Sequence, residues 1–153
     1  MSGGFGSQRR PQQANQGTGQ QYKLVTFKGE PSVAKLVTEH AEALAKHLGI
    51  RDDLTRTQLR RFYQEFVHIR QRISSGGANA YAENEVALKL LIAKAVYAGG
   101  RQNSKVPQDF IKWLKENLEQ IANKEDLEKF GHYFEAFIGY FYGHGGRAKG
   151  GGN

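Results

Sequence analysis

The residues best suited to bind a charged partner are arginines in the stretch from Leu54 to Ile73, which reads LTRTQLRRFYQEFVHIRQRI. Five arginines there face a single acid, Glu65. Guanidinium groups bind phosphates through paired hydrogen bonds, and neutralised phosphates release their counterions. Nucleic acid is the commonest partner of such a patch. Solubility alone is the alternative explanation.

Other residues that could do chemistry are sparse. There is no cysteine, which excludes disulfides and thiolate zinc sites. His40 and His47 lack a third ligand at metal spacing, so we expect them at the edge of the core. Asp52–Asp53 could be a carboxylate pair, but a polar turn between helices explains them as well and is favoured. No P-loop, nucleophile elbow, HExxH or dinucleotide-binding glycine motif is present. We therefore expect no enzyme, no cofactor and no metal.

The net charge of +7 is unevenly distributed. Residues 54–105 carry nine basic and three acidic side chains, whereas residues 106–143 carry four and seven. The middle of the chain is therefore predicted to form the cationic surface.

The arginine stretch is predicted to be an amphipathic helix with an apolar stripe, because its apolar residues recur at steps of three and four. Thr55 and Gln58 offer a capping box at its start. Arg56, Arg60 and Arg70 fall along one edge of the apolar face. Arg61, His68 and Arg72 fall on a separate strip. The stripe consists of Leu59, Phe62, Phe66, Ile69 and Ile73.

Four further helices are predicted around it, giving an all-α fold: a compact bundle of about five helices. One helix runs from near Pro31 to Gly49. Another runs from Ala80 to Ala98 and is ended by Gly99–Gly100. It is apolar nearly all round, so we expect it to be the central, most buried helix. The last two begin at Pro107 and after Asn123, which with Asp126 supplies a cap.

The two ends differ in composition from the helical part. Residues 1–30 are predicted to be a flexible basic tail, with Tyr22–Phe27 as an extended segment that could lie across the body. Residues 31–143 form the helical domain, and the Gly-rich residues 144–153 form a second flexible tail. No apolar run approaches the ~20 residues of a membrane span, so we expect a soluble, cytoplasmic protein without a membrane partner.

The final helix carries an aromatic run from Phe130 to Tyr142. Its phenylalanines share one helical face, which favours core or subunit packing over base stacking. Tyr133, Tyr140 and Tyr142 are the possible exceptions.

Three motifs in this order carry a resemblance to a known family. They are LTRTQLRRFYQEF (Leu54–Phe66), LKLLIAKAVYAGGR (Leu88–Arg101) and FEAFIGYFYG (Phe134–Gly143). Together they resemble the small helical subunit of the type III-A CRISPR effector, the Csm complex, over roughly residues 31 to 143. The corresponding subunit of the type III-B effector is an alternative, and a helical adaptor or homodimer without nucleic-acid function is another.

The resemblance implies a non-catalytic subunit of an antiviral ribonucleoprotein that stacks in several copies beside the guide RNA and its paired target RNA. It contacts RNA backbone and other subunits of the complex, while base pairing reads the sequence. The resemblance places basic positions on Arg60, Arg61 and Arg101, and the charge pattern adds the remaining candidates. The predicted RNA-binding residues are Arg56, Arg60, Arg61, Arg70, Lys94, Arg101 and Lys105.

Overall fold

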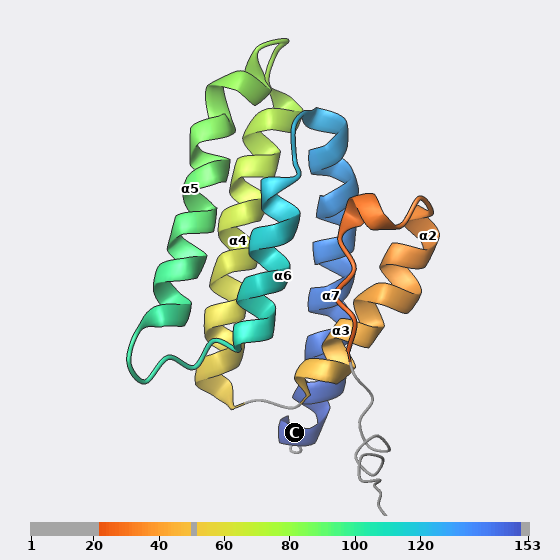
Figure 1. The fold of residues 1–153 in the computed structure, drawn as a ribbon, viewed down its shortest axis with the longest axis vertical. Helices are drawn as coiled ribbons and strands as arrows, with labels where there is room; N and C mark the ends of the chain where they lie inside the picture. The colour runs from red at the N-terminus through yellow and green to blue at the C-terminus, as the bar shows by residue number, and fades with distance from the viewer. Residues whose placement is uncertain (1–21, 50–51, 151–153) are drawn as a thin grey trace, which may run out of the picture.

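The computed structural model describes residues 22–49 and 52–150 as a bundle of long helices (Figure 1). No residue of these two ranges is in a strand, so the all-α prediction is confirmed. The first helical segment comprises α2 (Val33–Lys35), η2 (Leu36–His40) and α3 (Ala41–Leu48), preceded by the short turn η1 (Phe27–Gly29). The other helices are α4 (Asp53–Ser75), α5 (Ala80–Gly100), α6 (Gln108–Glu119) and α7 (Lys124–Gly150). None of these helices is long and apolar enough for a membrane span.

Helix α4 contains the arginine stretch and begins one turn earlier than its predicted cap. The predicted capping box of Thr55 and Gln58 is wrong: Asp52 is the N-cap, and its carboxylate accepts a hydrogen bond from the Thr55 amide at 2.8 Å. The Thr55 hydroxyl instead donates to the Lys105 carbonyl at 2.9 Å, which joins α4 to the loop before α6. Asp52 therefore has the turn role that was favoured for it. The predicted apolar stripe is inward-facing: Leu59, Phe66, Ile69 and Ile73 are buried and Phe62 is partly buried.

Helix α5 was expected at the centre of the bundle, and that expectation is wrong. It lies at the edge, packed on α4 and α6 (Figure 1). It ends at Gly100, so the Gly99–Gly100 pair that was predicted to follow the helix forms its last two residues. Gly99 permits close packing with α6, because a Cβ there would lie 2.9 Å from Cγ1 of Ile111. The apolar character of α5 therefore faces solvent as well as the core.

The aromatic core of the bundle lies between α6 and α7. Trp113 of α6 is fully buried against four aromatic rings of α7, with ring centroids 5.2 to 5.4 Å apart. The predicted cap of α7 is confirmed, since the Asp126 amide donates to the Asn123 side chain at 2.8 Å and the Asp126 carboxylate accepts from the Ala122 amide at 2.9 Å. Helix α7 continues to Gly150, beyond residue 143, where the helical domain was predicted to end.

The segment before α2 packs on this core. Phe27 is buried, and its amide donates a 2.7 Å hydrogen bond to the buried side chain of Asn117. Tyr133, one of the tyrosines considered for base stacking, is buried and donates to the Val25 carbonyl at 2.7 Å. Burial raises the pKa of Tyr133 to about 12. The core thus includes residues before the predicted boundary at residue 31.

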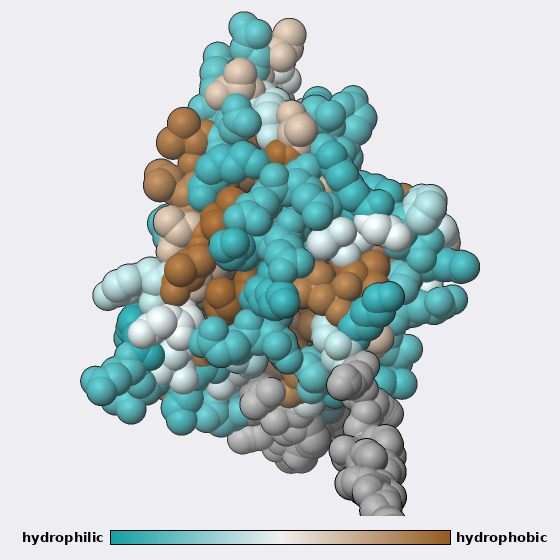
Figure 2. Space-filling view, viewed as in Figure 1, coloured by the Kyte–Doolittle hydropathy of each residue, from teal (hydrophilic) through white to brown (hydrophobic). Residues whose placement is uncertain are grey.

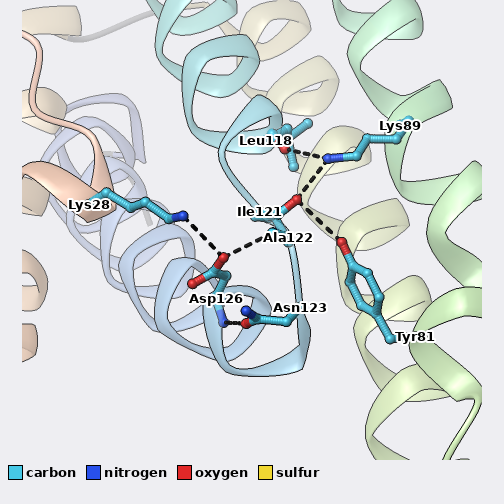
Figure 3. A network of polar contacts seen from close by, with 8 residues as sticks. All are labelled: Lys28, Tyr81, Lys89, Leu118, Ile121, Ala122, Asn123 and Asp126. Carbon is cyan, nitrogen blue, oxygen red and sulfur yellow. Dashed lines mark hydrogen bonds and ion pairs between the residues drawn. The ribbon is translucent and has the colours of Figure 1, made fainter.

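A lysine of α5 donates hydrogen bonds to backbone carbonyls at the C-terminal end of α6 and in the turn that follows it (Figure 3). Lys89 Nζ donates to the carbonyls of Leu118 at 3.2 Å and Ile121 at 2.8 Å, and the Tyr81 hydroxyl donates to Ile121 at 3.3 Å. The last carbonyls of a helix have no partner within it and carry partial negative charge, which a cation satisfies. Lys89 is therefore a structural residue that joins α5 to the α6–α7 turn.

We predict that Lys89→Met lowers the free energy of unfolding by about 1.5–3 kcal/mol, because two hydrogen bonds from a charged donor are lost at a partly buried site. Urea unfolding followed by circular dichroism measures the change. Lys112→Met is the matched control. Lys112 forms an exposed i,i+4 pair with Glu116, so its loss should cost less than about 0.5 kcal/mol. Equal effects of the two substitutions would contradict the assigned role.

Candidate nucleic-acid interface

Three of the predicted RNA-binding residues meet between α4, α5 and the loop after α5. Arg61, Lys94 and Arg101 line a pocket of about 210 Å³ together with Gln58 and Asn103. These residues are up to 45 positions apart in the sequence, and the packing of α5 on α4 brings them together. We call Arg61, Lys94 and Arg101 the cationic cluster.

The cationic cluster is accessible and carries excess positive charge. All three residues are exposed. Lys94 forms an ion pair with Glu65, the acid that also lines this pocket. The guanidinium of Arg101 lies 6.0 Å from the ring of the exposed Tyr97, which orients it by a cation–π contact. One acid against three cations leaves a surface that attracts phosphate.

Polar groups near the cluster were not among the predicted site residues. Gln58 Oε1 is buried at the pocket and has no hydrogen-bond partner within the described part of the chain. Asn103 has a positive φ of 62°, which turns the loop after α5 over the pocket. A buried acceptor without a partner costs stability, because its hydrogen bond to water is lost on folding. Asn103 belongs to no sequence motif and reaches the pocket through the loop conformation, whereas Gln58 lies on α4 within the Leu54–Phe66 motif.

The groove between α4 and α5 continues beyond the cluster. Arg61, His68 and Arg72, predicted to share a separate strip of α4, all line a second depression of about 500 Å³. Arg72 is held there by a 2.9 Å hydrogen bond from its Nε to the Asn84 side chain. The second strip therefore faces an open groove.

The other strip, with Arg56, Arg60 and Arg70, lies beside α7. The guanidinium of Arg56 lies 4.7 Å from the ring centroid of Tyr142, and that of Arg60 lies 5.4 Å from it. The Tyr142 hydroxyl donates to the backbone carbonyl of Arg56. The Arg56 side chain is only 19% exposed, whereas Arg60 is an exposed residue. These two arginines thus contribute to the contact between α4 and α7.

Arg70 is the most deeply engaged member of that strip. Its Nε and Nη2 donate to Oε1 of Glu128 at 3.1 and 2.8 Å, and Ser74 donates to the other carboxylate oxygen at 2.7 Å. Gly131 makes room for the guanidinium, since a Cβ there would lie 2.7 Å from Cζ of Arg70. The Arg70 side chain is 18% exposed. It lies against α7 and apart from the cationic cluster.

Lys105 lies at the end of the loop that follows α5. It is exposed, and its ammonium lies 3.9 Å from Asp52, the N-cap of α4. Its carbonyl is the acceptor for Thr55 described above. Lys105 therefore lies at the foot of α4 and does not line the pocket of the cationic cluster.

The histidines with a metal alternative are paired with acids. His40 Nε2 lies 2.9 Å from Glu30 and His47 Nε2 lies 2.6 Å from Asp109. Hydrogen bonds from His40 and the Ser32 amide hold the pKa of the Glu30 carboxyl below its usual value. Within residues 22–49 and 52–150, no group of three or more His, Cys, Asp or Glu residues has the arrangement of a metal site.

The family model that matches this chain is that of Csm2 of type III-A systems, over residues 31–147. The match covers most of the chain and includes all three motifs and the whole cationic cluster. The chain belongs to the Csm2 family. No curated protein and no solved structure matches it.

Csm2 proteins are the small subunit of the type III-A CRISPR effector, which joins them with other subunits and the guide RNA. The family is one of structural subunits, generally without catalytic activity. The resemblance to a type III-A subunit, as opposed to a type III-B subunit, is thus confirmed for this Csm2 chain.

The Arg70–Glu128 contact predicts a pH-dependent stability. The hydrogen bond from Arg70, with a smaller one from Ser74, lowers the pKa of Glu128 from 4.5. A carboxyl with a lowered pKa stabilises the fold above its unfolded-state pKa, and that contribution is lost as the pH falls through the folded-state value. Glu128→Gln should therefore lower the free energy of unfolding by roughly 1 kcal/mol at neutral pH. The difference from the wild type should shrink below pH 4.5.

Urea unfolding at a series of pH values measures this difference. Glu135→Gln is the control, because Glu135 lies 3.9 Å from Arg70 and is 62% exposed. It should change stability little at any pH. A Glu128→Gln effect that persists unchanged below pH 4 would show that Glu128 acts through packing and not through its charge.

Proposed function

We propose that this Csm2 chain contacts the backbone of the guide and target RNA through the cationic cluster of Arg61, Lys94 and Arg101. It does so as a non-catalytic subunit that stacks in several copies within the cytoplasmic effector complex. The observation that carries the proposal is the convergence of three exposed cations and a single acid on one pocket between α4 and α5.

The chemistry of the cluster suits backbone contact without sequence reading. Lys94 and the two arginines bind phosphate oxygens, which are the same at every nucleotide. Base pairing between guide and target then determines the sequence, as it does in other guided effectors.

The remaining predicted residues have different places in the proposal. Arg60 is exposed beside α7, and Lys105 is exposed at the foot of α4, so both extend the positive surface to either side of the cluster. Arg56 and Arg70 are contacted by Tyr142 and Glu128. We propose that these two act chiefly by holding α4 against α7, and that any RNA contact they make is secondary.

The test is neutralisation of the cluster in the assembled complex. We predict that Arg61→Gln, Lys94→Gln and Arg101→Gln together weaken binding of target RNA and reduce the magnitude of the slope of log K against log salt by about 2. Each lost phosphate contact removes about 0.7–0.9 from that slope. Filter binding at several salt concentrations measures both quantities, after native electrophoresis has shown that the complex assembles.

The control is a second triple variant with the same loss of charge: Lys112→Gln, Lys115→Gln and Lys124→Gln. These lysines lie on α6 and α7, away from the pocket. Their neutralisation should leave the salt slope unchanged within 0.5. Equal slopes for the two triples would reject the cluster as the RNA contact and would favour a helical adaptor whose charge serves solubility.

A further inference from the structure

A single carboxylate lies in the middle of the cationic groove between α4 and α5. The pocket of the cationic cluster and the second depression of about 500 Å³ share two lining residues, Arg61 and Glu65, so the two depressions join there. In the described part of the chain, Glu65 is the one acid that lines either of them. Arg61, Glu65, His68 and Arg72 follow one another on α4 at steps of four, three and four, which places them along one side of the helix. A phosphate chain that follows this side therefore passes a like charge.

Glu65 is paired with a cation of the other helix. Lys94 of α5 donates to its Oε2, across 29 positions of the sequence. Within residues 22–49 and 52–150, Lys94 is the one partner of the Glu65 carboxylate. The side chains of Glu65 and Lys94 are 39% and 55% exposed. The ion pair is therefore open to a phosphate that enters the groove.

The central part of α5 has no second cation to offer a phosphate. Between Val86 and Ala98 its charged residues are Lys89 and Lys94. Lys89 is bound to the carbonyls at the end of α6. Figure 2 shows the exposed edge of α5 as a run of brown, hydrophobic side chains. The positive charge that this part of α5 presents to RNA thus depends on Lys94, which Glu65 already holds.

From these observations we infer that Glu65 competes with RNA phosphates for Lys94 and so limits the affinity of the groove for RNA. When Lys94 binds a phosphate oxygen, its charge is withdrawn from the carboxylate, and the loss of that attraction is subtracted from the binding free energy. Glu65 is thus a residue that lowers affinity and is not itself an RNA contact. The inference rests on the proposed function, because it assigns an opposing residue to the same site.

A carboxylate in this position favours recognition by base pairing. Contacts to phosphates are the same for every sequence, so a groove lined by cations alone would hold any RNA strand more tightly. Glu65 reduces this sequence-independent part of the binding. Pairing between guide and target then supplies a larger share of the affinity.

The first experiment neutralises Glu65 in the assembled complex. Glu65→Gln keeps the shape of the side chain and removes its charge. We expect target RNA to bind about two- to fivefold more tightly, the range set by the loss of an exposed competing ion pair. The gain should shrink at high salt, since salt screens exposed charges. Filter binding at several salt concentrations measures the affinity, after native electrophoresis has shown that the complex assembles.

Glu116→Gln is the matched control for the change in net charge. Glu116 is 40% exposed, pairs with Lys112 on α6 and lines neither depression. Its substitution should leave the RNA affinity unchanged. An unchanged affinity of the Glu65→Gln complex would overturn the inference. Weaker binding would also overturn it, because Glu65 would then hold Lys94 in place for RNA.

The second experiment asks whether Glu65 acts through Lys94, by a double-mutant cycle. In complexes that already carry Lys94→Gln, the addition of Glu65→Gln should change the RNA affinity by less than about 1.5-fold, because the competed cation is gone. A gain of equal size with and without Lys94 would overturn the competition. It would show that the carboxylate repels the RNA directly.

The failure of this inference is distinguishable from the failure of the proposed function. If neutralisation of the cationic cluster reduces the salt slope while Glu65→Gln leaves the affinity unchanged, the RNA contact stands and the competition is rejected. If neither set of substitutions changes RNA binding, the RNA contact itself is rejected and the competition with it.

Discussion

The structure depends on the burial of one aromatic cluster, formed where α4, α6 and α7 meet. Phe66 of α4, Trp113 of α6 and Phe130 and Phe134 of α7 are fully buried. The ring centroids of Phe130 and Phe134 lie 5.3 to 5.5 Å from each other and from those of Phe66 and Trp113. Large aromatic side chains contribute most of the apolar area in such a core, and tilted and edge-on contacts fix their orientation. The cluster therefore fixes the rotation of α4 about its own axis.

That rotation divides the arginines of α4 into two groups with different surroundings. Once Phe66 points at the cluster, one edge of α4 lies against α7 and the other lies along α5. Arg70 then meets Glu128 and the ring of Tyr142 meets Arg56, whereas Arg61 lies in the groove with Lys94. The arginines on the edge facing α7 therefore hold the two helices together, whereas Arg61 on the edge facing α5 stays available to a partner. The same residue type has two roles because the aromatic core selects which edge is covered.

Local sequence signals were sufficient for most of the fold. The apolar stripe of α4, the Asn123–Asp126 cap and the buried face of α7 each depend on residues within a few turns of one another, and the structure confirms all three. The division of the arginines could not be read in this way. Tyr142 lies 86 positions from Arg56, and Glu128 lies 58 from Arg70. A helical projection gives the direction of a side chain but not the element that covers it.

The position of helix α5 in the bundle also could not be predicted from its apolar pattern. An all-round apolar helix is expected in a core, yet the same pattern arises when one side of a helix packs on its own chain and the other on a separate molecule. The periodicity of apolar residues cannot distinguish a core helix from a helix packed between two molecules, since neither has a polar face. Size gives a reason to expect the second case, because a small chain can surround few helices completely. The aromatic cluster already places α6 and α7 at the centre, so α5 is left with α4 and α6 on one side. Its other side, which carries Val86, Leu90 and Tyr97, is exposed.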